Sequence, residues 1–196
     1  MPPLARWRRV FLPLGRQRST TALPFLPMQP LEIIIDTREQ TPWAFDPQDA
    51  HCVRGTLRTG DYALAGDDGY AIERKSLNDF LGTISSGWER FEKELRRAHE
   101  RGFVMPVIVE GDIDDMLWST TPDGDLVEPA NDHPGVNAGF VLKQIAQIIV
   151  RHGHSFIPCK NAANAAAVAY ACLCERQAQI NEEALKEAAS NGHQPS

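Results

Sequence analysis

The sequence predicts an α/β domain in which a sheet is flanked by helices. Short apolar runs typical of buried strands alternate with amphipathic segments of helical period, and acidic residues follow the strand runs. A length of 196 residues with 42% hydrophobic content suits one ordinary soluble domain. No apolar run approaches the roughly 20 residues needed to span a membrane, so no membrane partner is expected.

The first half of the chain begins with a strand and a hairpin. The apolar run Leu31 to Ile35 predicts a buried strand, and Asp36 follows it where α/β proteins place site residues. A carboxylate that only shapes a turn is the alternative for Asp36. The segment 52–57 should be a second strand or a connector. The turn residues 66–69 (Gly-Asp-Asp-Gly) lie between two segments rich in Tyr, Ile and Leu, which predicts a β-hairpin.

Two helices are expected next. Residues 76–84 should form a short helix with Ser76 as its N-cap. Asp79, at the third helical position, then has an ordinary structural role in the first turn. Residues 88–101 should form an amphipathic helix, and many charges on its outer faces should pair at i,i+4 spacing.

The second half adds two strands and two helices around a long loop. The expected elements are a strand 104–109, a helical turn 113–118, a loop 120–138, a helix 140–152, a strand 155–158 and an Ala-rich helix 161–177. In the helix 140–152, Val141, Ile145, Ile148 and Ile149 should face inward. The Ala-rich helix can continue through Lys186.

The domain is predicted to occupy residues 31–176, between a tail at 1–30 and a polar tail at 177–196. Residues 1–30 hold five arginines and no acid, and they lack a sustained period, so we expect disorder. Three interpretations of this segment remain open: a basic arm that touches DNA, an organelle transit peptide, and an artefact of a start codon assigned upstream of the natural start at Met28. A dispensable tail is favoured. Four cysteines without metal-type spacing are expected to be free thiols.

The hairpin carries the residues most typical of a metal-dependent nuclease. Side chains alternate along a strand, so Glu73 and Lys75 share one face and Arg74 lies on the other. If Asp61 opens the facing strand, two carboxylates and an ammonium group meet at one end of the hairpin. Mg²⁺ prefers such oxygen ligands, and a cation beside the attacking water suits hydrolysis. A solvated surface pair is the common alternative.

The charge distribution is the main argument against a nucleic-acid partner. The net charge is −6, and without the five arginines of residues 1–30 it is about −11. A chain this acidic needs a local basic surface to bind DNA. The helix 88–101 supplies the candidates Arg90, Arg96, Arg97 and Arg101.

In order, these segments resemble the XPF-type (XPF, Mus and Hef) structure-specific endonucleases. Gly60-Asp61, eleven intervening residues, Glu73-Arg74-Lys75, three more and Asp79 are similar to the family's G-D-x(n)-E-R-K-x(3)-D motif. The strand end Ile35-Asp36-Thr37-Arg38-Glu39 resembles the V-D-x-R-E that precedes it. Further segments match the family's R-F segment and later strands, and the resemblance covers about residues 31–175.

The resemblance implies a restriction-endonuclease-like fold of the PD-(D/E)xK type, with a central mixed sheet flanked by helices. It implies that Asp61 and Glu73 bind Mg²⁺, for which Mn²⁺ can substitute. Asp36 would complete the acidic cluster, directly or through water. Lys75 would hold and polarise the water that attacks phosphorus.

Further residues receive supporting roles from the resemblance. Arg74 would orient the substrate or bind phosphate beside Asp79, and both would belong to the catalytic set. Arg38 would contact DNA, and Arg38 and Glu39 would also support the ligands. Four histidines without metal spacing are expected on the surface or in the core: His99, His133, His152 and His154.

The sequence departs from the family pattern after its last core helix. Eukaryotic and archaeal relatives append a tandem helix-hairpin-helix domain, whereas only about twenty polar residues follow here. We therefore expect a stand-alone nuclease domain of the phage and bacterial kind. A homodimer through this domain is expected to use the Ala-rich helix.

The predicted function is a Mg²⁺-dependent DNA endonuclease that hydrolyses phosphodiester bonds in branched, flapped or forked DNA. Repair, recombination and phage DNA processing are the expected settings, in the cytoplasm of a bacterium or an infected host. Organelle import through residues 1–27 is a minor alternative. The alternative functions are a catalytically inactive DNA-binding module and a protein-interaction module of the same fold. The presence of Asp36, Asp61, Glu73, Lys75 and Asp79 favours the enzyme.

Overall fold

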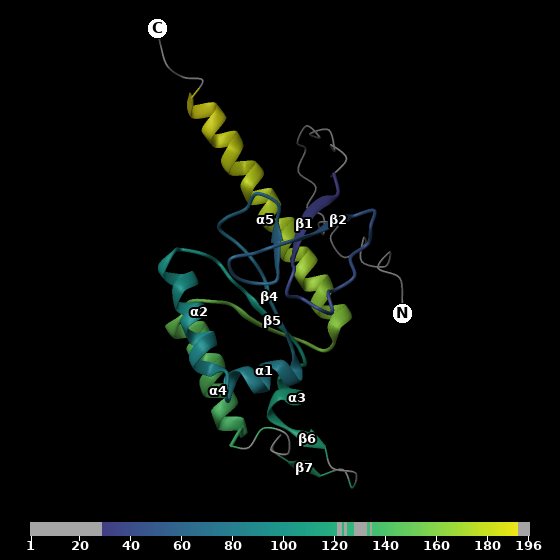
Figure 1. Ribbon diagram of the computed structural model, residues 1–196, viewed down its shortest axis with the longest axis vertical. Helices are drawn as coiled ribbons and strands as arrows, with labels where there is room; N and C mark the ends of the chain where they lie inside the picture. Colours follow the sequence, from purple (N-terminus) through teal and green to yellow (C-terminus); the bar gives the residue numbers. More distant parts are fainter. Residues whose placement is uncertain (1–28, 121–122, 124, 128–132, 134, 192–196) are drawn as a thin grey trace, which may run out of the picture.

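The computed structural model describes residues 29–120, 123, 125–127, 133 and 135–191, and a mixed sheet lies between helices at its centre (Figure 1). The predicted tail 1–28 lies outside the described residues, as do several positions of the predicted loop 120–138. The part of the chain that is described contains no helix long and apolar enough to cross a membrane. Its four cysteines are free thiols, as predicted.

The main strands form two three-stranded parts. In the first, β1 pairs in parallel with β2 and antiparallel with β3. In the second, β5 lies between β4 and β8, and all three run parallel. A separate antiparallel pair is formed by β6 and β7. The strands are β1 (Leu31–Asp36), β2 (Ala50–Gly55), β3 (Tyr62–Leu64), β4 (Glu73–Ser76), β5 (Val107–Glu110), β6 (Ser119–Thr120), β7 (Leu126–Val127) and β8 (Phe156–Cys159).

One residue pair joins the two parts of the sheet. Tyr62 of β3 and Ile72 exchange backbone hydrogen bonds of 3.1 and 2.7 Å, and the amide of Asp61 donates to the same Ile72 carbonyl at 2.7 Å. The predicted hairpin is therefore present but shorter than expected. Beyond this pair, β3 stays paired with β1, and β4 stays paired with β5. The strands β3 and β4 diverge from each other, because twisted strands separate unless hydrogen bonds hold them together.

Helices cover both faces of the sheet. The helix α5 packs on one face, and α1, α2 and α4 pack on the other. The helices are α1 (Leu77–Ile84), α2 (Trp88–Glu100), α3 (Ile113–Leu117), α4 (Ala138–Ala146), the π-helix η2 (Gln147–Arg151) and α5 (Ala162–Asn191).

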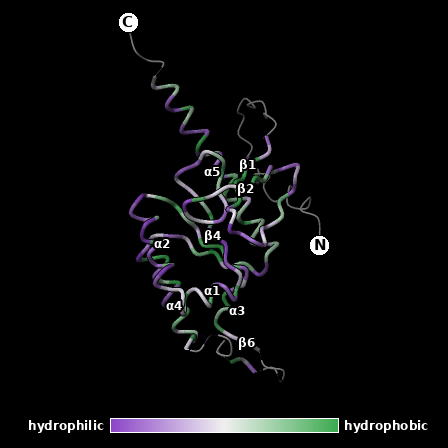
Figure 2. The backbone as a smooth tube through the Cα atoms, in the orientation of Figure 1, coloured by the Kyte–Doolittle hydropathy of each residue, from purple (hydrophilic) through white to green (hydrophobic). Residues whose placement is uncertain are grey.

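The strand β5 divides the hydrophobic interior into two cores. Side chains alternate along a strand, so Ile108 packs toward α5 while Val107 and Val109 pack toward α1, α2 and α4. All three are fully buried. Figure 2 shows hydrophobic segments gathered in the middle of the molecule and a mostly hydrophilic α2. The amphipathic pattern of α2 was thus predicted correctly, with Phe91, Leu95 and other apolar residues inward.

Several predicted boundaries shift in the structure. The strand predicted from Val104 starts at Val107, and Val104 is exposed. The helix predicted over 140–152 changes to π-helical turns at Gln147. A π turn contains about one more residue than an α turn, so the positions whose side chains face the core shift along the sequence. Ile148 is buried, whereas Ile149 is 46% exposed and its predicted inward position was wrong.

The last helix is longer than the predicted 161–177. Its first half carries small residues, including Ala165 and Ala169, that are buried against the sheet. Beyond Ile180 the helix is exposed and extends past the rest of the molecule (Figure 1). Ala165 and Ala169 are therefore used within this chain, and a homodimer through this helix stays a prediction.

Substitution of Gly60 by Ala should destabilise the protein by about 1–3 kcal/mol, as overpacking does elsewhere. Gly60 has φ +72°, and a Cβ there would lie 2.9 Å from the Ala71 Cβ and 3.1 Å from the Ile72 carbonyl oxygen. Because this contact lies at the joint of the two sheet parts, the variant should also disturb Asp61. Chemical denaturation measures the loss.

Gly66→Ala is the matched control, because Gly66 has φ +81° but no atom within 4 Å of the added Cβ. It should lose only the cost of the unusual backbone conformation, about 1 kcal/mol. Equal losses in the two variants would show that the close approach at Gly60 does not matter.

Candidate functional site

The fold brings four sequence-predicted residues to one edge of the sheet. Asp36 ends β1, Asp61 directly precedes β3, and Glu73 and Lys75 lie on β4. The backbone amide of Arg74 donates to Asp61 Oδ2 at 2.7 Å, which fixes the Asp61 carboxylate near Glu73 and Lys75. The pairing of Tyr62 with Ile72 therefore brings Asp61 close to Glu73, although the two residues are twelve positions apart in the sequence.

Glu73 and Lys75 share a strand face, as the alternation predicted. The Lys75 ammonium group forms an ion pair with Glu73 Oε1. Both side chains are largely buried, with 7% and 18% of their surface exposed for Glu73 and Lys75. Burial raises the pKa of Glu73 even with Lys75 beside it. Burial would lower the pKa of Lys75, but the charge and hydrogen bond of Glu73 outweigh it, so the pKa is raised and Lys75 is an ammonium ion.

Asp61 has a strongly raised pKa. Burial and, second, the nearby charge of Glu73 raise its pKa to about 7. The hydrogen bond from the Arg74 amide and the charge of Lys75 act in the opposite direction and only partly compensate. A buried carboxylate (Glu73) and a half-buried one (Asp61) that repel each other are a typical feature of a cation site, where a bound ion would relieve the repulsion.

Asp36 is held differently. Its Oδ1 accepts from the Arg38 backbone amide at 2.8 Å and from Arg38 Nε at 2.7 Å, and its Oδ2 accepts from the Leu57 amide at 2.7 Å. Burial acts to raise the pKa of Asp36, but these hydrogen bonds outweigh it and leave the pKa below its ordinary value. The side chain connects β1 to the segment after β2 and positions Arg38.

The donor set fits a hard divalent cation at Asp61 and Glu73. One oxygen of each carboxylate, Asp61 Oδ1 and Glu73 Oε2, has no hydrogen bond to another described residue. These are the oxygen ligands that Mg²⁺ takes while it retains several waters. No group of three or more acids, cysteines or histidines in the described part of the chain is arranged to hold a metal. The role of Asp36 as a third ligand stays a prediction.

Arg74 lies on the opposite face of β4 and is held by acids. Its Nε donates to Glu110 Oε1 at 2.7 Å, and its Nη1 donates to Glu39 Oε1 at 3.1 Å. The guanidinium group also lies 5.9 Å from the ring centre of Trp43, whose Nε1 donates to the same Glu110 oxygen at 2.6 Å. This ion-pair network ties β4 to β5 and to the segment after β1.

Asp79 is a capping residue in this structure. Its backbone amide donates to Ser76 Oγ at 3.1 Å, and Ser76 Oγ donates to Asp79 Oδ2 at 2.7 Å, as the sequence predicted. Both oxygens lie at the exposed start of α1. The predicted roles of Asp79 and Arg74 in catalysis remain predictions, and the described partners of Arg74 do not include Asp79.

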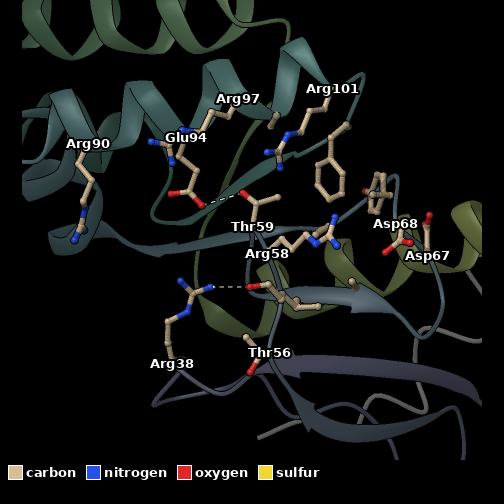
Figure 3. Close-up of a pocket in the computed structure, with 16 residues that line it drawn as sticks. Arg38, Thr56, Arg58, Thr59, Asp67, Asp68, Arg90, Glu94, Arg97 and Arg101 are labelled. Atoms are coloured by element: carbon tan, nitrogen blue, oxygen red, sulfur yellow. Dashed lines mark hydrogen bonds between the residues drawn. The ribbon is translucent and has the colours of Figure 1, made fainter.

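A basic cleft of about 490 Å³ opens beside the acids. It lies between α2, the segment after β2 and the turn after β3. Five arginines line it, and Glu94 accepts from Thr59 Oγ1 at 2.9 Å within it. Figure 3 shows Arg58 and Arg101 toward the end formed by the Asp67–Asp68 turn. Arg38 and Arg90 lie at the opposite end, where Arg38 binds Asp36.

The cleft separates the arginines that the sequence grouped together. Arg38, Arg90, Arg97 and Arg101 line it, whereas Arg96 is absent from its lining and lies 3.9 Å from Glu100. Sequence reasoning missed Arg58 and Glu94. The charge of Glu94 contributes to the pKa shifts of Glu73, Lys75 and Arg38, so this cleft residue lies close to the acids.

The histidines lie away from this cluster. His154 is buried, with Nε2 2.8 Å from the Leu95 carbonyl oxygen, and His152 is buried 3.5 Å from Glu92 Oε1. Burial lowers the pKa of both rings. They are core residues, one of the two positions that the sequence predicted for them.

Comparison with known families gives one match. The model of the ERCC4 domain matches residues 35–172, a range that contains the acids, Lys75 and α2. A comparison with curated proteins finds no match.

Solved structures agree with the family match. XPF from Aeropyrum pernix aligns with a TM-score of 0.55 at 17% identity, covering 74% of this chain and 61% of that one. XPF from Aeropyrum pernix in complex with DNA aligns with a TM-score of 0.54 at 18% identity, covering 76% and 66%. At these identities the likeness shows the fold, and it confirms the predicted restriction-endonuclease-like α/β class. The chain spans less than two thirds of the length of either XPF chain.

Substitution of Asp61 by Asn should raise the stability of the metal-free protein at pH 8. The pKa of Asp61 is about 7 in the folded protein against an ordinary value of 3.8. The folded state thus holds the proton more tightly, so the contribution of Asp61 to stability is full below pH 3.8 and is lost as the pH rises through 7. Asn keeps an oxygen acceptor for the Arg74 amide and removes the buried charge. Thermal unfolding in EDTA should show a Tm gain of a few degrees at pH 8 and a smaller one at pH 5.

Asp68→Asn, on the exposed turn, is the control and should leave Tm nearly unchanged. A variant at Asp61 that is less stable than the wild type at pH 8 would contradict the raised pKa and the repulsion by Glu73.

Proposed function

Because the chain belongs to the ERCC4 domain family, we propose that it is a metal-dependent DNA endonuclease that hydrolyses phosphodiester bonds. One observation carries the proposal. The half-buried Asp61 and the buried Glu73, with the Lys75 ammonium group beside them, lie next to a cleft lined by arginines. This combines cation ligands, a catalytic cation and a phosphate-binding surface in one place.

Asp61 and Glu73 would hold Mg²⁺, and Mn²⁺ would serve in its place. The bound ion would supply Lewis-acid chemistry and would lower the pKa of a coordinated water. Asp61 must be deprotonated to bind it, so affinity for the metal rises with pH through about 7. Asp36 already uses both oxygens on Arg38 and Leu57, and it would bind the ion only if one of these hydrogen bonds broke.

Lys75 would orient the attacking water. Its ammonium group is held by Glu73 on the face that carries both acids, so it can donate a hydrogen bond to a water or phosphate oxygen there. It remains protonated near neutral pH, because the charge of Glu73 keeps its pKa raised. It therefore acts as a hydrogen-bond donor and a positive charge rather than as a base.

Arg74 would act through position rather than through contact with substrate. Its side chain is 12% exposed, its Nε donates to Glu110, and its Nη1 donates to Glu39 and Thr41. Its backbone amide holds Asp61 at 2.7 Å. Rigid support of β4 on one face thus orients Asp61, Glu73 and Lys75 on the other.

Branched, flapped or forked DNA is the proposed substrate, with repair, recombination or phage DNA processing as the setting. The arginines of the cleft would neutralise backbone phosphates next to the acids. A homodimer through the domain is also proposed. Exposed apolar side chains for such a contact lie on α4 and η2, namely Leu142, Ile149 and Val150.

Cleavage of fork, flap, duplex and single-stranded DNA tests the proposed function. Wild-type protein with Mg²⁺ or Mn²⁺ should cut at least one branched substrate, and EDTA should abolish the cutting. Asp61→Asn should reduce the rate at least about 100-fold, because it removes a ligand charge from the ion. Circular dichroism and thermal unfolding establish that the variant is folded.

Glu187→Gln, on the exposed part of α5 and outside the cleft, should cut at the wild-type rate. Absence of metal-dependent cutting on every substrate, or equal cutting by Asp61→Asn, would overturn the enzymatic proposal. DNA binding without cutting would then identify a non-catalytic DNA-binding module, and absence of both would favour a protein-interaction module.

A further inference from the structure

Four arginines of the cleft have no acidic partner in the described part of the chain. Arg58, Arg90, Arg97 and Arg101 form no ion pair there, although acids outnumber bases in this protein. Other bases of α2 are paired, because Lys93 lies 2.6 Å from Glu89 and Arg96 lies 3.9 Å from Glu100. These four arginines are exposed, and their unpaired guanidinium groups line one cleft, so they are available to bind an anion. Phosphate matches their planar donors.

The same cleft has an aromatic wall at the C-terminal end of α2. Phe103 lines it, two residues after Arg101. The helix ends at Glu100, and Gly102, two residues later, has φ +67°. The amides of Gly102 and Phe103 donate to the carbonyls of His99 and Ala98, both at 2.9 Å. This C-terminal motif fixes the direction of the chain. The Phe103 ring is therefore partly buried against the helix core while it lines the cleft.

A second aromatic residue, Tyr70, is fixed on the facing turn. The Gly69 carbonyl accepts from the Val104 amide at 2.9 Å, which ties the turn to the residue after Phe103. Asp67 in the same turn is neutralised by Arg176 of α5, with N–O distances of 2.7 and 2.9 Å. This acidic turn therefore repels phosphate less than its sequence suggests.

The size of the cleft selects what can enter it. A volume of about 490 Å³ is that of a small-ligand pocket and suits a nucleotide unit or a short single strand. The major groove of a DNA duplex is about 12 Å wide, and the whole duplex is wider still. A duplex can therefore only lie across the opening of the cleft. Bases paired inside a duplex keep their faces stacked on each other, so only an unpaired base can stack on Phe103 or Tyr70.

We propose that this cleft binds an unpaired DNA strand next to the acids, with its bases against Phe103 and Tyr70 and its phosphates on the unpaired arginines. The inference rests on the proposed function and names the part of a branched substrate that the site recognises. Arg38 and Arg90 lie at the end of the cleft near Asp36, and Arg58 and Arg101 lie at the other end (Figure 3). The strand would therefore run from the acids toward the aromatic wall.

Binding of a fluorescent oligothymidine of about eight nucleotides, and of a blunt duplex of the same length, tests the proposal by anisotropy in EDTA. Phe103→Leu keeps apolar volume against the core but removes the flat ring. It should weaken single-strand binding at least about fivefold and leave duplex binding within twofold. Phe103→Tyr keeps the ring and should bind like the wild type.

Two arginine variants provide a second comparison. Arg97→Ala should weaken binding of both DNAs and reduce the slope of log affinity against log salt by about one. Arg96→Ala, on the adjacent residue outside the cleft, should change neither.

An unchanged single-strand affinity in Phe103→Leu, or an equal loss on the duplex, would overturn the proposal. If the wild type cuts branched DNA with metal while Phe103→Leu binds and cuts normally, the proposed function stands and only this inference fails. A wild type that neither binds nor cuts any DNA would remove both.

Discussion

The pairing of Tyr62 with Ile72 is the constraint on which the site depends. It joins the two three-stranded parts of the sheet and brings Asp61 beside Glu73. The backbone contributes twice, because Asp61 donates through its amide to Ile72 and accepts through its carboxylate from the Arg74 amide. The result is one buried and one half-buried carboxylate with one ammonium group. Burial and mutual repulsion make this arrangement costly without a cation, and such cost is typical of a functional site.

Helix geometry explains how an acidic chain can present a basic surface. Arg90, Glu94, Arg97 and Arg101 follow at steps of four, three and four residues, so they lie on one face of α2 toward the cleft. Lys93 and Arg96 lie on other faces and have acidic neighbours there. The net charge of −6 is the sum over the whole chain, whereas the cleft has its own local charge.

Much of the site could be predicted from the sequence. Strand alternation alone separates Arg74 from Glu73 and Lys75, and the N-cap signal at Ser76 gives the start of α1. The partners of Arg74 could not be found this way. Glu110 reaches it because β5 pairs in parallel with β4, a contact between residues 36 positions apart that no local pattern encodes.

Two other features show where local patterns fail. The helical spacing of α2 could have separated Arg96 from Arg97, but only the fold shows which face of the helix meets the acids. Arg58 lies in a segment without periodicity, so nothing in the sequence marks it. The inward position predicted for Ile149 failed because η2 changes the helical period within one continuous helix.

The central claim is that Asp61 and Glu73 form a cation site while Asp36 stays bonded to Arg38 and Leu57. A crystal structure of the Mn²⁺-soaked protein with anomalous diffraction data tests it most directly. The account predicts one strong anomalous peak bound by oxygens of Asp61 and Glu73, with ligand distances near 2.1–2.2 Å. Absence of a peak after a soak at saturating Mn²⁺, or a Mn²⁺ peak elsewhere in the domain, would contradict it.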